Sequence, residues 1–137
     1  MAKSTFSGPI QSNSGYMTPV VATPLASFTL TTAQVGGSYV INNENNGGPG
    51  SAITVTLPVV SGTFQNPDPR YNGIRGGLFN ASGTLTHLLD AGSQKINGST
   101  SAVNIPPLHF AEWIGNGNEN DPWLCRISPL VSAAAQP

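Results

Sequence analysis

The chain has 137 residues, 8% of them charged, and a formal net charge of −1. Because soluble domains usually carry about 25% charged residues, solubility here must come from neutral hydrogen-bonding groups. The five lysines and arginines are scattered and form no basic stripe, which argues against a nucleic-acid partner. No run of eighteen apolar residues and no apolar leader segment is present, so neither a membrane span nor classical export is expected.

Glycine and proline interrupt the chain too often for a long helix to form. They account for 16 and 12 residues, and the longest run without either is 25–35. Because glycine and proline cost about 1 and 3 kcal/mol inside a helix, this composition predicts an all-β chain. A chain of this length buries roughly two thirds of its unfolded surface, which is enough for one core.

The first 24 residues are predicted to form an extended N-terminal arm. Pro9, Pro19 and Pro24 separate small polar residues and isolated apolar side chains. A segment of this composition cannot build a core of its own, so it is either disordered or lies on another surface. We expect the contacts with that surface to be made by Phe6, Pro9, Ile10, Tyr16 and Met17.

Residues 25–127 are expected to form one β domain, followed by a short tail over 128–137. Apolar and polar residues alternate there in short segments bounded by Gly, Pro, Asn and Ser, which is the pattern of half-buried strands. The predicted strands are 27–31, 38–42, 52–57, 63–65, 74–80, 84–89, 94–96, 101–105, 108–114 and 123–127.

Segment 36–58 carries the strongest strand signal. Residues 52–57 alternate Ile, Val and Leu with hydroxyl residues, and Pro58 ends the ladder because it lacks a backbone donor. A stretch rich in Asn and Gly, 43–50, separates this strand from the one at 38–42. We therefore predict that the two strands pair as a hairpin.

Many short strands with turn signals between them are typical of two packed sheets. We predict an antiparallel β-sandwich that is jelly-roll-like, with a small β-barrel as the alternative. Asn72-Gly73 and Asn97-Gly98 are expected in tight turns, and residues 115–122 in a polar loop between two strands.

Six carboxylates are present, and none belongs to a recognisable catalytic pair. Asp68 stands between two prolines, where a turn residue is expected. Glu112 shares the parity of Phe110 and Ile114 in its predicted strand. A strand-end position or an ion pair with Arg126 is its expected role, and a catalytic acid is the alternative. No catalytic residue is predicted.

His87 shares the parity of Leu85 and Leu89, which predicts a hydrogen-bonded histidine near the core. Together with His109 and Cys125 it offers at most three zinc ligands, without the local spacing of a zinc motif. Cys125 is expected to be a buried thiol, and as the single cysteine it cannot form an intramolecular disulfide. No metal, cofactor or nucleophile elbow is predicted.

Two further binding interpretations stay open. Oxygen-bearing side chains gather at 42–46 and 116–121, as in calcium loops, although turns are the expected use of such Asn-Gly runs. Tyr71, Trp113 and Trp123 have the ring faces on which sugars stack, although packing is their expected role. The core is expected to be deepest near the two tryptophans.

Several strings stand out in order along the chain: GSYVIN at 37–42, ITVTLP at 53–58 with Gly62 after it, KING at 95–98, and WIGNG at 113–117 before WL at 123–124. Together they resemble a β-rich module of tailed-bacteriophage virion proteins, over residues 36–127. The opening string STFSGPIQS at 4–12 is similar to the N-terminus of small phage structural proteins. The long, Gly-rich loop at 42–51 departs from the module.

The resemblance implies a virion component, and it brings no catalytic residue with it. The implied function is that of a capsid decoration (cement) protein, which binds the outer surface of a phage capsid and stabilises it. A tail fibre or spike module for host recognition is the alternative, and a carbohydrate-active enzyme is the third hypothesis. The implied partners are the major capsid protein and further copies of the chain, as a homotrimer. The implied location is the virion, assembled in the host cytoplasm.

Overall fold

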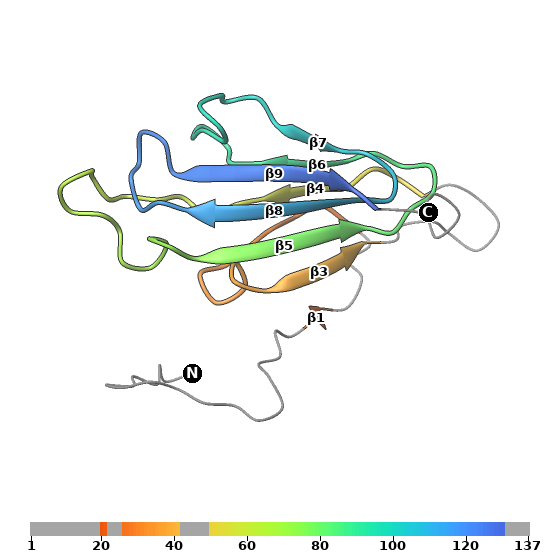
Figure 1. Cartoon of the computed structure of the whole chain (residues 1–137), viewed down its shortest axis with the longest axis horizontal. Helices are drawn as coiled ribbons and strands as arrows, with labels where there is room; N and C mark the ends of the chain where they lie inside the picture. The colour runs from red at the N-terminus through yellow and green to blue at the C-terminus, as the bar shows by residue number, and fades with distance from the viewer. Residues whose placement is uncertain (1–19, 22–25, 42–49, 131–137) are drawn as a thin grey trace, which may run out of the picture.

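The structure is a computed structural model, and it describes residues 20–21, 26–41 and 50–130. All regular elements in these ranges are strands, which confirms the all-β prediction (Figure 1). They are β1 (Val20–Val21), β2 (Phe28–Thr29), β3 (Ser38–Ile41), β4 (Thr54–Thr56), β5 (Arg75–Asn80), β6 (His87–Asp90), β7 (Val103–Ile105), β8 (His109–Gly115) and β9 (Trp123–Pro129).

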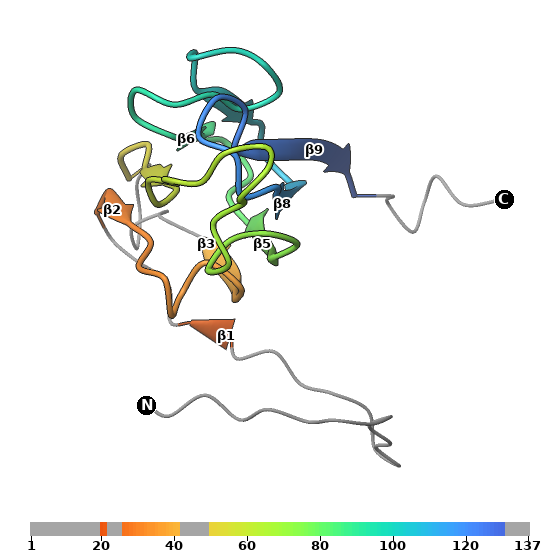
Figure 2. The same cartoon turned by 90° about the vertical axis from the view of Figure 1, so that its left-hand side faces the viewer.

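The strands form two open sheets. The five-stranded sheet has the order β1-β3-β5-β8-β9, and the four-stranded sheet has the order β2-β4-β6-β7. Figure 1 shows β9, β8, β5 and β3 side by side, and Figure 2 shows the molecule from one end. Apolar side chains from both sheets meet in one core, so the arrangement is sandwich-like. Because both strand orders are open, the described strands do not form a barrel.

The direction of the strands differs from the predicted antiparallel sandwich. β1, β3 and β5 are parallel neighbours, and so are β2, β4 and β6. The pairs β5-β8, β6-β7 and β8-β9 are antiparallel. From β1 to β6 the chain alternates between the two sheets, so strands that neighbour each other in a sheet run the same way. Antiparallel pairing is therefore wrong for four of the seven strand pairs, and a jelly roll, which needs antiparallel neighbours, is not confirmed.

The predicted hairpin between residues 38–42 and 52–57 does not form. β3 pairs with β5, and β4 pairs with β6, so the two segments lie in different sheets. Tyr39 and Ile41 of β3 and Val55 of β4 are all buried in the shared core. When the two strands lie in facing sheets, their apolar side chains bury each other. In a hairpin, both sets of apolar side chains would lie on the same face of one sheet, and another element would still have to bury them.

The two tryptophans are the largest fully buried side chains of the core. Trp113 of β8 and Trp123 of β9 are fully buried. Each indole N–H donates to a backbone carbonyl, Trp113 to Val35 at 2.8 Å and Trp123 to Pro58 at 3.3 Å. The Tyr71 ring packs against Trp123 in a T-shaped arrangement, with ring centroids 5.8 Å apart. These contacts hold β8 and β9 against the rest of the core, because the indole rings are buried and their N–H groups are hydrogen-bonded.

Two predicted strands are absent from the sheets. Residues 63–65 belong to a turn instead, closed by hydrogen bonds between Thr63 and Asn66. Residues 94–96 contribute only isolated bridges at Ile96. Both segments are three residues long, and a β propensity over so few residues does not hold a place in a sheet against a competing turn.

The ends of the predicted domain also shift. Val20–Val21, which fall within the predicted arm, pair with β3, and β9 continues to Pro129, beyond the predicted strand end at 127. The arm contacts Phe6, Pro9, Ile10, Tyr16 and Met17 lie outside the described residues, as does the tail from residue 131.

Two side-chain amides each bind both the N–H and the carbonyl of one backbone residue, as a neighbouring strand would. Asn97, at φ +53°, donates from Nδ2 to the Cys125 carbonyl and accepts at Oδ1 from the Cys125 N–H, both at 2.8 Å. Gln94 makes the same pair of bonds with Val60, at 2.7 and 2.9 Å. Gly98 follows at φ +79°, so the Asn97-Gly98 turn has the predicted geometry. At Cys125 the Asn97 amide covers the outer edge of β9.

Residues 58–73 and 115–122 form what we call the loop end of the molecule (Figure 1). The Asp68 N–H donates to the Gly117 carbonyl at 2.8 Å and ties the two loops together. A Cβ at Gly62 would overlap backbone atoms of both Asp68 and Gly117, so only glycine allows this approach.

Asp68 is the polar centre of the loop end. Its carboxylate binds Arg70 in a two-point contact, at 3.0 Å from Nε and 2.7 Å from Nη2. The Ser61 N–H and hydroxyl donate to the same carboxylate at 3.2 and 3.3 Å. Hydrogen bonds from Arg70 hold the pKa of Asp68 far below its usual range. The Asp68 carbonyl accepts from the N–H groups of Tyr71 and Asn72, which confirms the predicted turn role.

Candidate interaction surface

The three residues considered as zinc ligands are not brought together. His87 lies on β6 in the core, His109 opens β8 with Nδ1 2.8 Å from the Pro107 carbonyl, and Cys125 lies in β9. In the part of the chain that the structure describes, no group of three His, Cys, Asp or Glu residues is placed to hold a metal ion.

His87 is a hydrogen-bonded core histidine, as predicted. It is fully buried, and the Ile53 N–H donates to its Nδ1 at 3.0 Å. This bond places the ring proton on Nε2, which has no hydrogen-bond partner among the described residues. Burial lowers the pKa of His87 below its ordinary value, so the ring is neutral at pH 7 and its role is structural.

In the polar loop at 116–121, two asparagine side-chain oxygens close turns of the loop itself, whereas Asp121 Oδ1 is buried without a hydrogen-bond partner among the described residues. Asn116 Oδ1 accepts from the Asn118 N–H at 2.8 Å, and Asn118 Oδ1 accepts from the Asn120 N–H at 3.2 Å. These contacts are turn chemistry, in line with the expected use of the Asn residues. The second oxygen-rich stretch, 42–46, lies outside the described residues.

The three candidate sugar-stacking rings are interior. Tyr71, Trp113 and Trp123 are at most 2% exposed, so their expected packing role is confirmed. The exposed large apolar residues of the loop end are Phe64, at 85%, and Val59, at 68%. Phe64 had been expected in a strand, and the turn at 63–66 presents it to solvent instead.

The outward side of the five-stranded sheet carries a second accessible surface, which we call the outer face. Side chains of β8 alternate between the buried Ala111 and Trp113 and the partly exposed Glu112 and Ile114. The strand register places the outward residues in three rows across the sheet: Arg75, Ile114 and Leu124; Ser38, Gly77, Glu112 and Arg126; and Val40, Phe79, Phe110 and Ser128.

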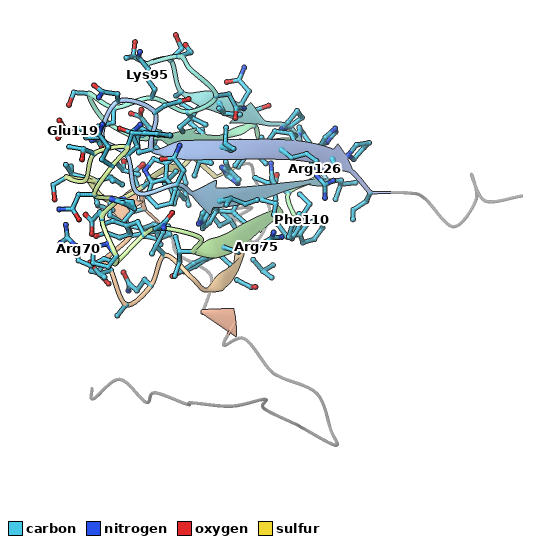
Figure 3. All side chains as sticks on the ribbon, turned by 60° about the vertical axis from the view of Figure 1, so that its left-hand side comes forward. Arg70, Arg75, Lys95, Phe110, Glu119 and Arg126 are labelled. Carbon is cyan, nitrogen blue, oxygen red and sulfur yellow. The ribbon has the colours of Figure 1, made fainter. Side chains whose placement is uncertain are left out.

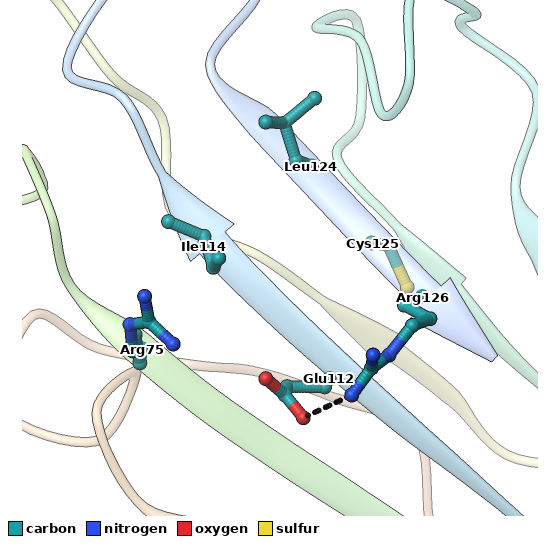
Figure 4. Close-up of a pocket in the computed structure, with 6 residues that line it drawn as sticks. All are labelled: Arg75, Glu112, Ile114, Leu124, Cys125 and Arg126. Carbon is teal, nitrogen blue, oxygen red and sulfur yellow. Dashed lines mark hydrogen bonds and ion pairs between the residues drawn. The ribbon is translucent and has the colours of Figure 1, made fainter. Parts of the chain in front are cut away.

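The outer face is hollowed around Glu112. Two hollows of about 350 and 230 Å³ both include Arg75 and Glu112 among their lining residues. Ile114 and Leu124 line the larger hollow, and Phe110 lines the smaller. The close-up in Figure 4 shows Arg75 on β5 and Glu112 on β8, with Leu124 on β9. Charged and apolar groups therefore stand side by side on a rigid sheet.

The charges of the larger hollow are not balanced. Glu112 pairs with Arg126 Nη2 at 3.4 Å, which confirms the predicted pair (Figure 4). Arg75 is exposed and forms no ion pair with any residue that the structure describes. Two guanidinium groups and one carboxylate leave one unit of positive charge. Figure 3 shows that Arg75 and Arg126 lie apart from Arg70.

Cys125 also lines the larger hollow, and it is half-buried rather than fully buried. Burial raises the pKa of its thiol to about 11. The thiol is therefore protonated at neutral pH and is a poor nucleophile. The Asn97 side chain hydrogen-bonds both the N–H and the carbonyl of Cys125, so this residue anchors the edge of β9.

Sequence reasoning did not single out Arg75, Leu124 or Phe64. The sequence does indicate that Arg75 points outward, because Arg75 and the apolar Leu78 have opposite parity in the predicted strand at 74–80. Parity alone does not show that β5, β8 and β9 are neighbours, so the meeting of Arg75 with Glu112 was not visible.

The chain matches no known protein family and no curated protein. Among the residues described, no helix is long and apolar enough to cross a membrane.

Proposed function

We propose that this chain is a non-enzymatic virion protein that binds the outer surface of a phage capsid and stabilises it. The outer face carries the binding part of the proposal, because it leaves apolar side chains accessible beside the Arg75 guanidinium, which has no ion pair within the described part of the chain. The sequence resemblance over 36–127 supplies the kind of partner, the major capsid protein. Nucleic acid and membranes are not part of the proposal.

The non-enzymatic part rests on how the reactive groups are used. Asp68 is engaged by Arg70, His87 is buried and neutral, and the Cys125 thiol is protonated. Each is a group that general acid, base or nucleophilic chemistry would need free and accessible. A screen of glycan hydrolysis is expected to find no turnover, and a turnover lost in Glu112→Gln would overturn this part.

The test of the main proposal is the copy number and position of the protein in purified virions. Quantitative mass spectrometry is expected to give hundreds of copies per particle, and gold-labelled antibody is expected to mark the whole head. A homotrimer is proposed as the working unit, and sedimentation checks it in solution and on the shell. A monomer in both states would reject the trimer.

A tail fibre or spike module is the second candidate, and the loop end favours it. Phe64 stands 85% exposed on a turn that hydrogen bonds hold in place, as a recognition residue for a host surface would. A few copies at one vertex of the virion would support this candidate and reject decoration.

The N-terminal arm is proposed as a strap on the capsid or on a neighbouring copy, with Phe6, Pro9, Ile10, Tyr16 and Met17 as its contacts. Each large apolar anchor removed from water contributes roughly 1.5–3 kcal/mol. Deleting residues 2–19 keeps β1 and is expected to leave the melting temperature unchanged while head binding drops. Unchanged co-sedimentation with heads would reject the strap.

A further inference from the structure

We propose that the outer face is the docking site for a carboxylate of the partner protein, and that Arg75 is the residue that binds it. This inference deepens the proposed function and rests on it, because the partner is then the major capsid protein. The carboxylate belongs to an Asp or Glu side chain that enters the larger hollow beside Glu112.

A carboxylate complements the charge of the larger hollow. Arg126 already has a carboxylate partner at 3.4 Å, whereas Arg75 has none within the described ranges. The hollow therefore lacks one negative charge, which a single carboxylate supplies. A guanidinium binds a carboxylate with two parallel hydrogen bonds, so Arg75 provides orientation as well as attraction.

The rim of the larger hollow includes two aliphatic side chains. Ile114 stands in the same row as Arg75, and Leu124 follows it at 48% exposure. Apolar side chains beside a charged pair exclude water and strengthen the pair when a partner covers them. A carboxylate on an aliphatic side chain fits this rim. A phosphate chain fits less well, because Glu112 adds repulsion against every further negative charge.

The outer face of a second copy does not complement the charge of this hollow. Two outer faces brought together would each carry one excess positive charge, and like charges oppose the contact. A partner surface with a net negative charge removes that cost. Strand β5, which carries Arg75, is held by pairing with β3 on one side and β8 on the other. Little ordering of the backbone is therefore needed on docking.

The first experiment compares two charge reversals in the full chain. Arg75→Glu is expected to weaken co-sedimentation with phage heads purified without this protein by about tenfold or more. Lys95→Glu is the matched control, because it makes the same change of charge at an exposed position outside both hollows. Both variants are expected to have the melting temperature of the wild type, so that a loss of binding can be distinguished from a loss of folding.

The second experiment locates the partner carboxylate. Arg75→Lys keeps the charge and introduces an amine that a carbodiimide joins to a carboxylate in direct contact. Mass spectrometry of bound heads is expected to find residue 75 joined to an Asp or Glu of the major capsid protein. The wild-type chain, which has Arg at this position, is expected to give no such product.

The outcomes separate the two proposals. If the wild type does not bind heads, the proposed function fails and this inference fails with it. If the wild type binds and Arg75→Glu binds as well as Lys95→Glu, only the inference is overturned. A product between residue 75 and another copy of this chain overturns it too, as does head binding lost in Phe64→Ser alone.

Discussion

The loop end and the outer face use their polar groups in opposite ways. At the loop end, Asp68 receives hydrogen bonds from Arg70 and Ser61, and the loop backbones bind each other. On the outer face, Glu112 has one contact of 3.4 Å with Arg126, and Arg75 has no ion pair with the described residues. The chain itself satisfies the Asp68 carboxylate, although Asp121 Oδ1 in the same region is buried without a hydrogen-bond partner among the described residues, and the outer face leaves Arg75 without an ion pair among them.

The comparison matters because the chain has so few charges. Within the described ranges, Arg70 and Arg126 each form an ion pair, whereas the exposed Arg75 and Lys95 form none. A saturated region resists change and contributes to stability, whereas an unsaturated surface contributes to binding at little cost to stability. Mutations are therefore expected to divide by region: large losses of stability at the loop end, and small ones on the outer face.

The largest effect is expected from Gly62→Ala at the loop end. A Cβ there overlaps backbone atoms of Asp68 and Gly117, which cannot rotate away, so the two loops must separate. We expect a loss of about 3 kcal/mol in urea unfolding. Gly92→Ala is the control: its Cβ meets nothing within 4 Å, and only the φ of +63° opposes it, at about 1–2 kcal/mol. Equal losses in the two variants would show that the loops are not tightly joined.

The next effect compares the two ion pairs directly. Asp68→Asn removes the charge that Arg70 and Ser61 bind in a nearly inaccessible place, and about 1–3 kcal/mol of stability is expected to go. Glu112→Gln breaks an exposed pair, worth at most about 1 kcal/mol. Chemical unfolding of both variants measures the difference. A larger loss in Glu112→Gln would reverse the comparison.

The sequence was sufficient for features that depend on local chemistry. Glycine and proline excluded helices, Asn97-Gly98 formed its turn, His87 lies in the core as its parity indicated, and Trp113 is buried as expected for a packing role. These outcomes depend on a residue and its near neighbours along the chain. The pair of Glu112 with Arg126 was also within reach, because both side chains belong to strands joined by one loop.

The sequence was not sufficient for the partners of β3 and β4. An alternating stripe specifies which face of a strand is buried, and it is the same in a parallel and an antiparallel neighbour. Whether β3 and β4 pair with each other depends on whether the chain crosses to the other sheet between them, and no residue between 38 and 57 indicates that crossing. The outer face depends on that choice, because Arg75 approaches Glu112 only when β5 lies beside β8.

A pH scan extends the comparison to the core. The pKa of His87 lies below its ordinary 6.5 in the folded chain, so the unfolded chain takes up the proton first, and stability is lost as the pH falls below 6.5. The lowered pKa of Asp68 gives a second loss as the pH falls through 3.8.

Two variants assign these steps to their residues. His87→Asn keeps an acceptor for the Ile53 N–H and is expected to remove the dependence near pH 6, and Asp68→Asn is expected to remove the dependence below pH 4. Melting temperatures measured from pH 3 to pH 8 follow both. A dependence near pH 6 that survives in His87→Asn would assign that step to another group.

The smallest effects on stability are expected from the exposed apolar residues, one from each region. Phe64 is 85% exposed, so Phe64→Ser removes little buried area and is expected to stay within about 0.5 kcal/mol, whereas Leu124 is 48% exposed and Leu124→Ser is expected to cost about 1 kcal/mol. Their effects on head binding should differ, because Leu124 borders the hollow of Arg75 and Phe64 does not. Leu124→Ser is expected to weaken co-sedimentation with heads, and Phe64→Ser is expected to leave it unchanged. The reverse result would move the docking site to the loop end and identify the turn at 63–66 as its contact.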